Sequence, residues 1–152
     1  MVEEAFIPNL YLVVYACEYC AYAAADLAGA LRMQYPPDIK IVQIPCSGKM
    51  DIILALQALE DGVDGVITAG CLPGECHYLE GNVSARRRVE RLQQILEEIG
   101  LEPQRVRMIN LSSTMAGQFV AAVTEITRQI QALGANPLRD QKQNRIISEK
   151  EE

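Results

Sequence analysis

The sequence predicts a doubly wound α/β domain of the flavodoxin or Rossmann-like kind, in which helices cover both faces of a four-stranded parallel sheet. Two observations lead to this prediction. Short apolar runs alternate with longer amphipathic segments, which is typical of strand–helix units and a parallel sheet. The chain has 152 residues, 49% of them hydrophobic, which is enough for one domain with a sizeable core.

Four short apolar runs predict the strands of this sheet. They are rich in Val and Ile, which favours buried strands over loops. We expect these strands at residues 10–16, 39–45, 63–69 and 105–111.

The amphipathic segments between the strands predict four helices, at residues 21–34, 49–60, 83–99 and 114–133. We expect Ser47 to cap the amino end of the second helix and Gly62 to end it. Residues 1–135 are expected to form the α/β domain. Residues 136–152 are polar and show no periodicity, so we expect a C-terminal tail there.

Composition excludes several classes of partner. The formal net charge is -6 and Trp is absent, so neither a phosphate backbone nor stacked bases are expected ligands. No apolar run reaches the roughly 18 residues that span a membrane. The start, Met1-Val2-Glu3-Glu4, lacks the basic region of a signal peptide. We therefore expect a cytoplasmic protein whose cysteines stay reduced.

The five cysteines are placed at the carboxyl ends of the first three predicted strands. Because the carboxyl ends of parallel strands meet at one edge of a sheet, all five are expected at that edge. A single cysteine is often only a small buried apolar residue. Five on one edge indicate a metal or redox site, made of Cys17, Cys20, Cys46, Cys71 and Cys76.

Three kinds of chemistry fit these thiols. Cys17 and Cys20 after a strand and before a helix are typical of a dithiol–disulfide oxidoreductase. Four thiolates, or three with His77, would suit structural zinc. An iron–sulfur cluster needs about four thiolates and accepts them from scattered loops. The spacing alone leaves these alternatives open.

Other residues near the thiols have expected secondary roles. His77 is expected to hydrogen-bond either within its loop or to a cluster sulfur, and Gly48 and Gly74 to let backbone N–H groups approach the site. A run of arginines, Arg86, Arg87, Arg88 and Arg91, opens the third helix, where the helix dipole disfavours cations. It fits either a solvated helix start or a surface that docks an acidic partner.

Several ordered motifs resemble the iron–sulfur (delta) subunit family of methyl-viologen-reducing hydrogenase, over residues 11–134. The motifs are Cys17-Glu18-Tyr19-Cys20, Gln34-Tyr35-Pro36-Pro37, Cys46-Ser47-Gly48-Lys49, Gly70-Cys71 and Gly74-Glu75-Cys76-His77-Tyr78. The resemblance implies a [2Fe–2S] cluster held by four of the five cysteines. It also implies an electron relay between a hydrogenase or other dehydrogenase and the flavin subunit of heterodisulfide-reductase-type complexes, where electron bifurcation occurs. Such a subunit is expected to have no catalysis of its own.

Overall fold

The structure is a computed structural model that describes residues 10–76 and 78–150. Its strands pair in parallel in the order β2-β1-β3-β4, which confirms the predicted four-stranded doubly wound sheet. Gly65–Gly70 is buried along its whole length at the centre of the sheet. The strands are β1 (Leu12–Cys17), β2 (Ile39–Ile44), β3 (Gly65–Gly70) and β4 (Val106–Asn110).

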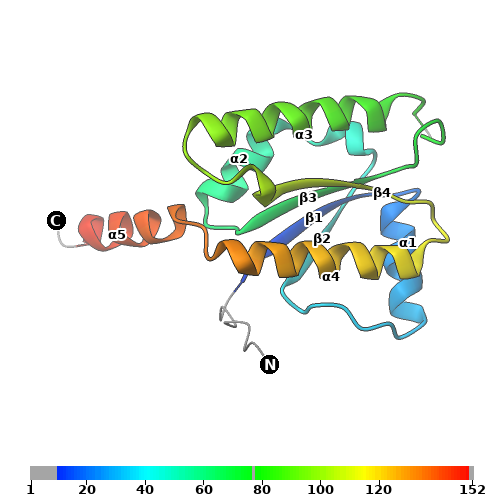
Figure 1. Cartoon of the computed structure of the whole chain (residues 1–152), viewed down its shortest axis with the longest axis horizontal. Helices are drawn as coiled ribbons and strands as arrows, with labels where there is room; N and C mark the ends of the chain where they lie inside the picture. The colour runs from blue at the N-terminus through cyan, green and yellow to red at the C-terminus, as the bar shows by residue number, and fades with distance from the viewer. Residues whose placement is uncertain (1–9, 77, 151–152) are drawn as a thin grey trace.

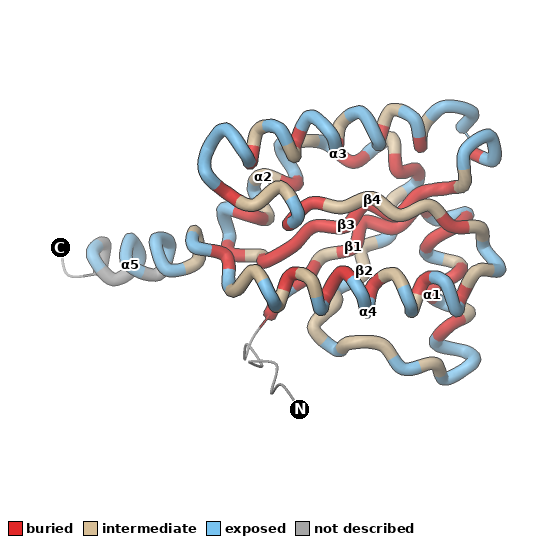
Figure 2. Tube along the Cα trace, in the orientation of Figure 1, coloured by how far each residue is buried: buried red, intermediate tan, exposed pale blue. Residues whose placement is uncertain are grey.

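Helices cover both faces of the sheet, as Figure 1 shows. One face packs against α1 and α4, and the other against α2 and α3, so the sheet separates two apolar cores (Figure 2). Two 3-10 turns, η1 (Ser47–Lys49) and η2 (Pro103–Arg105), complete the connections. The helices are α1 (Ala21–Ala30), α2 (Ile52–Glu60), α3 (Gly81–Glu98), α4 (Ala116–Leu133) and α5 (Leu138–Lys150).

The amino end of α2 differs from the prediction. Asp51, not Ser47, is its N-cap, and the Asp51 carboxylate accepts a hydrogen bond of 3.0 Å from the N–H of Ile53. The Ser47 prediction was wrong because residues 47–49 form the separate turn η1, which leads into α2 without being part of it. Gly62 follows the end of α2 with a φ of 101°, the left-handed conformation expected there.

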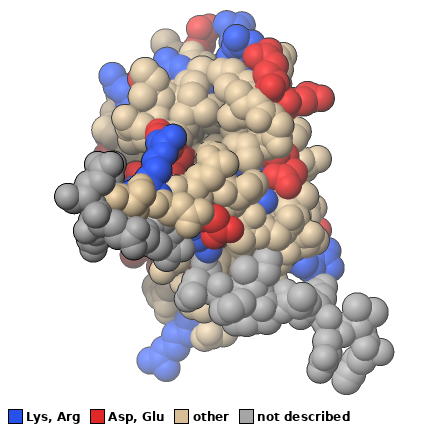
Figure 3. All heavy atoms as spheres, turned by 90° about the vertical axis from the view of Figure 1, so that its left-hand side faces the viewer, with Lys and Arg blue, Asp and Glu red and all other residues tan. Residues whose placement is uncertain are grey.

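The polar segment after residue 135 contains a helix, α5, which extends from the domain at the left of Figure 1. Arg139 ties its first turn to the domain through the Gly62 carbonyl and the Asp64 carboxylate. Figure 3 views this end of the molecule, where acidic and basic side chains both occur. The domain boundary at residue 135 stays a prediction. Among the described helices, none has both the length and the apolar character that crossing a bilayer requires.

Candidate metal centre

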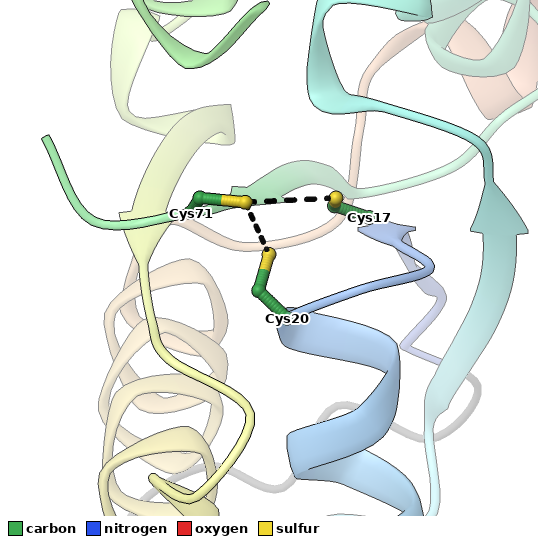
Figure 4. A group of neighbouring side chains, drawn as sticks. All are labelled: Cys17, Cys20 and Cys71. Atoms are coloured by element: carbon green, nitrogen blue, oxygen red, sulfur yellow. Dashed lines mark hydrogen bonds between the residues drawn. The ribbon is translucent and has the colours of Figure 1, made fainter. Parts of the chain in front are cut away.

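Three of the five predicted cysteines form a compact group at the carboxyl edge of the sheet. Cys17 ends β1, Cys20 precedes α1 and Cys71 follows β3. Their sulfur atoms all lie within 4.8 Å of one another, in the arrangement that Figure 4 shows. The sulfur of Cys71 is 3.2 Å from that of Cys20 and 3.8 Å from that of Cys17. We call these three residues the thiol triad.

The other two cysteines, Cys46 and Cys76, lie against the first residue of α3. A Cβ atom placed on Gly81 would overlap the Cys46 sulfur and stand 3.2 Å from the Cys76 sulfur. The two thiols are also close enough to share a hydrogen bond. The negative charge of a Cys17 thiolate is near enough to Cys46 to raise the pKa of its thiol. This thiol pair therefore adjoins the thiol triad, and the structure brings all five predicted cysteines to one place.

Strand register explains this convergence. The last residue of β1, Cys17, pairs with Ile44 at the end of β2, two residues before Cys46. On the other side of β1, Ala16 pairs with Ala69, two residues before Cys71. Three adjacent strands thus end at the same level, and each delivers a cysteine to the edge at its last residue or just beyond. All five cysteines are buried.

The thiol triad favours one thiolate beside one protonated thiol. The Cys20 thiol, which donates a hydrogen bond to Cys17, lowers the pKa of the Cys17 thiol from 9.0 to about 5, against the effect of burial. The same hydrogen bond, with burial, raises the pKa of the Cys20 thiol. A cysteine that is already ionised at neutral pH is a ready metal ligand, because the thiolate is the form that binds metals.

The thiol pair is polarised in the same way. Burial raises the pKa of the Cys46 thiol, although the N–H of Gly48 donates a hydrogen bond to its sulfur, at 3.4 Å. Burial also works to raise the pKa of the Cys76 thiol. Backbone N–H groups around it, chiefly that of Asn82, outweigh burial and lower this pKa below its usual value. Each group of thiols therefore offers one sulfur that backbone or thiol donors stabilise as an anion.

Two asparagines hold the backbone of Cys71. The side-chain amide of Asn82 donates to the carbonyls of Cys71, at 3.2 Å, and Leu72, at 2.9 Å. Asn110 donates to the same Cys71 carbonyl at 2.7 Å, and Arg86 donates to the Asn110 side chain at 2.7 Å. These residues fix one thiol of the triad through its main chain. Neither asparagine was predicted from the sequence.

The arginine run also supports the cysteine-bearing segments. The guanidinium of Arg88 donates to the carbonyls of Gly48 and Met50, and so holds the segment that follows Cys46. Arg86 acts on the Cys71 segment through Asn110. The helix dipole disfavours cations at the start of a helix. Arg86 and Arg88 are nevertheless accommodated there, because carbonyl and amide oxygens of neighbouring segments accept their hydrogen bonds. Their unusual position in α3 was the one sequence signal for this role.

The predicted secondary residues have different surroundings. A Cβ atom on Gly48 would approach the Gly81 Cα to 2.9 Å, so glycine is needed where these two segments meet. Gly74 has a φ of 81°, and a Cβ atom on it would meet nothing within 4 Å, which fits a turn residue. His77 lies outside the described residues. The assignment of all three to cofactor binding stays a prediction.

The fold and the site define a class of protein: a small parallel α/β domain with a buried thiol cluster at the carboxyl edge of its sheet. The family model described as "Methyl-viologen-reducing hydrogenase, delta subunit" matches residues 12–134. The chain therefore belongs to the delta-subunit family of methyl-viologen-reducing hydrogenase, which confirms the resemblance seen in its motifs.

Individual relatives extend this result. The chain is 44% identical over 132 residues to the iron-sulfur subunit of the F420-non-reducing hydrogenase of Archaeoglobus profundus, covering 87% of this chain and 95% of that one. It is also 44% identical, over 130 residues, to the vhu iron-sulfur subunit of the F420-non-reducing hydrogenase of Methanocaldococcus jannaschii, covering 86% and 97%. A longer protein, one of the subunits of the Ferredoxin:CoB-CoM heterodisulfide reductase of Methanosarcina mazei, is 38% identical over 124 residues, which are 82% of this chain and 16% of that protein.

Proposed function

We propose that this chain is an iron–sulfur subunit that relays electrons through a [2Fe–2S] cluster. It would connect a hydrogenase or other dehydrogenase to the flavin subunit of a heterodisulfide-reductase-type, electron-bifurcating complex. The observation that carries the proposal is the convergence of five buried thiols, in two adjoining groups, at one edge of the sheet.

The residues present fit such a cluster. A [2Fe–2S] cluster takes about four thiolates, two for each iron, and the five cysteines offer them as a triad and a pair. Gly81 lacks the Cβ atom that would crowd the pair, and Gly48 lacks the one that would collide with the backbone of Gly81. We propose four of Cys17, Cys20, Cys46, Cys71 and Cys76 as ligands, with the fifth thiol adjacent.

Two alternatives explain fewer of these contacts. A dithiol–disulfide site would use Cys17 and Cys20, but the sulfur of Cys71 lies as close as 3.2 Å to that of Cys20. A single zinc ion binds four ligands in a closed tetrahedron, and it would not account for two groups that total five thiols. The metal content of the protein distinguishes both alternatives directly from an iron–sulfur cluster.

When bound, the cluster would supply one-electron redox chemistry. The polypeptide contributes three things to that chemistry. Its thiols provide ligands, the backbone N–H groups around Cys17 and Cys76 stabilise negative charge on sulfur, and burial limits access of water. We propose that the chain has no independent catalysis, because a relay subunit only passes electrons between the redox centres of its partners.

The relatives support the proposed partners. Two of them are named as iron–sulfur subunits of hydrogenases. Most of this chain matches a segment that makes up 16% of a heterodisulfide reductase polypeptide. In that protein, a region similar to this chain is therefore part of the same polypeptide as the rest of the reductase subunit. We propose that the present chain makes a comparable contact as a separate subunit. It would work in the cytoplasm, where a reducing environment keeps its thiols available.

Metal analysis tests this proposal. Protein purified without oxygen would be assayed for iron, acid-labile sulfide and zinc, and then reduced for EPR spectroscopy. We expect about two iron and two sulfide per chain, with an EPR signal on one-electron reduction. Zinc alone would favour an interaction module instead. A metal-free protein with a titratable dithiol would favour the oxidoreductase.

A matched pair of variants then tests the ligands. Cys76→Ala removes a thiol of the pair and is expected to lower the cluster content strongly. Leu79→Ala, in the same loop but with a side chain that is 83% exposed, is expected to retain the cluster. Full cluster content in Cys76→Ala would remove Cys76 from the ligand set.

A further inference from the structure

A buried serine hydroxyl beside the thiols is left unpaired by the part of the chain that the structure describes. Ser47 is 1% exposed, and its hydroxyl makes no hydrogen bond to any described residue. Burying a polar group without a hydrogen bond destabilises a folded protein, so such groups are rare and usually have a reason. The capping role that the sequence suggested for Ser47 does not provide that reason, because Asp51 caps α2.

Ser47 lies among three of the cysteines. It follows Cys46 directly in the chain, and its backbone N–H donates a hydrogen bond to the sulfur of Cys17. Its hydroxyl oxygen would stand 2.6 Å from a Cβ atom on Gly70, the residue that precedes Cys71. The hydroxyl is therefore packed over the end of β3, between segments that carry cysteines of both thiol groups.

The segment that carries Ser47 is held in place from two sides. The N–H of Met50 donates to the Ser47 carbonyl at 3.1 Å, which closes the turn η1. Arg88 donates to the carbonyls of Gly48 and Met50 on the outer side of the same turn. The side chain of Ser47 is thus fixed at the thiol cluster by main-chain contacts that do not use its hydroxyl.

We infer that the Ser47 hydroxyl donates a hydrogen bond to a sulfur atom of the bound cluster and thereby raises its reduction potential. The inference rests on the proposed function. Sulfide and thiolate sulfurs accept hydrogen bonds, and such bonds help to set the potential of an iron–sulfur cluster. A donor stabilises the reduced cluster more than the oxidised one, because reduction adds negative charge to the sulfurs. The bond would also satisfy a hydroxyl that residues 10–76 and 78–150 leave unpaired.

A second buried hydroxyl offers a matched control. Thr68 is fully buried and its hydroxyl also makes no hydrogen bond to any described residue. It lies on β3 two residues before Gly70, on the same face of the sheet and roughly 6.5 Å further from the carboxyl edge. The competing explanation is that one buried water satisfies both hydroxyls, in which case neither contacts the cluster.

The test is a redox titration, followed by EPR, of cluster-loaded wild-type, Ser47→Ala and Thr68→Val proteins. Each variant removes one hydroxyl without adding volume. Iron content checks that each variant is loaded with the cluster, and the thermal unfolding midpoint checks that it is folded. For Ser47→Ala we expect the ratio of reduced to oxidised cluster at a given potential to fall about tenfold, a shift of about 59 mV to lower potential. Thr68→Val is expected to keep the wild-type potential.

The outcomes separate this inference from the function on which it rests. A wild-type chain that binds no iron and sulfide would overturn both. A loaded Ser47→Ala protein with an unshifted potential would overturn only the role of Ser47. Equal shifts in Ser47→Ala and Thr68→Val would also overturn it, since they would indicate a shared water network instead of a direct bond to the cluster.

Discussion

The two ends of the sheet satisfy their buried polar groups in different ways. At the amino edge, the buried carboxylate of Asp64 accepts hydrogen bonds from the N–H groups of Tyr11, at 2.8 Å, and Asn136, at 2.7 Å, and from the guanidinium of Arg139. Nearby, the fully buried Arg105 donates to the carbonyls of Asp64, at 3.0 Å, and of residues 134 and 135. The polypeptide supplies both donors and acceptors at this end.

The carboxyl edge is built otherwise. Its buried thiols contact one another and accept hydrogen bonds from backbone N–H groups, and the hydroxyl of Ser47 makes no hydrogen bond to any described residue. Sulfur atoms are weak hydrogen-bonding groups, so such contacts stabilise a fold little. The buried polar groups of the amino edge thus pair within the chain, whereas the carboxyl edge gathers the thiols that would bind the cluster we propose.

Replacing the buried Arg105 at the amino edge should produce the largest loss in the free energy of unfolding. Arg105→Met keeps much of the side-chain volume but leaves the carbonyls of Asp64 and Gly134 and the carboxylate of Glu102 without their donor. We expect the free energy of unfolding to fall by about 3–5 kcal/mol, because each buried carbonyl that loses its donor costs about 1–3 kcal/mol. Urea unfolding of metal-free and loaded protein would measure it.

The loss should be the same in both forms, because Arg105 lies at the edge away from the thiols. Arg128→Met, an exposed arginine that pairs with Glu125, serves as the control and should lose far less stability. A loss that appeared only in loaded Arg105→Met protein would mean that the two edges are coupled and do not behave independently.

The two asparagines on the Cys71 carbonyl should show a smaller, non-additive effect. Asn82→Ala removes two hydrogen bonds, leaving the Cys71 carbonyl to Asn110 and the Leu72 carbonyl to the N–H of Glu75. Asn110→Ala leaves the Cys71 carbonyl to Asn82 alone among these side chains. We expect losses in unfolding free energy of about 1–3 kcal/mol for Asn82→Ala and less for Asn110→Ala. The double variant should lose more than the sum, because only then does the Cys71 carbonyl lose both of these side-chain donors. Additive losses would argue against a shared acceptor.

A methyl group at the thiol pair should affect cluster retention more than folding. In Gly81→Ala the new Cβ atom meets the sulfurs of Cys46 and Cys76, which can rotate away in the metal-free chain but not when both bind metal. We expect about tenfold weaker retention of iron against a chelator. Gly29→Ala, in α1, places its Cβ atom in open space and should match wild type. Equal retention in both variants would place the cluster away from Gly81.

Acidification should weaken the amino edge slightly. Burial works to raise the pKa of the Glu102 carboxyl, but the hydrogen bond from Arg105 lowers it below the usual 4.5. The stabilisation is therefore present above pH 4.5 and is lost as the pH falls through the lower folded value. Because this side chain is 39% exposed, we expect less than about 1 kcal/mol.

Urea unfolding at neutral pH and below pH 4 would measure this loss. The Glu102→Gln protein should lack that part of the pH dependence. If its unfolding free energy fell with pH as steeply as that of wild type, the ion pair would contribute nothing to the amino edge.

Much of the site could be predicted from local pattern. Four cysteines directly follow an apolar run or open the segment after one, Cys76 lies in the loop after the third run, and parallel strands bring such positions to one edge. The helix α5 could not be predicted in this way, because its sequence lacks an apolar face of helical period. The sequence did not identify Asp51 as the cap of α2, because serine and aspartate are both favourable N-cap residues. Only the presence of the turn η1 at residues 47–49 shows that Ser47 does not cap this helix.

The sequence by itself determined the alternation of strands and helices and the position of every cysteine relative to a strand end, because both are local properties of the chain. Only the tertiary structure decided how the thiols divide into the triad and the pair, and which side chains hold them. Those contacts join residues far apart in the sequence, such as Arg88 with Gly48 and Asn110 with Cys71. A local pattern does not encode such pairings, since they depend on strand order and on where each loop folds back.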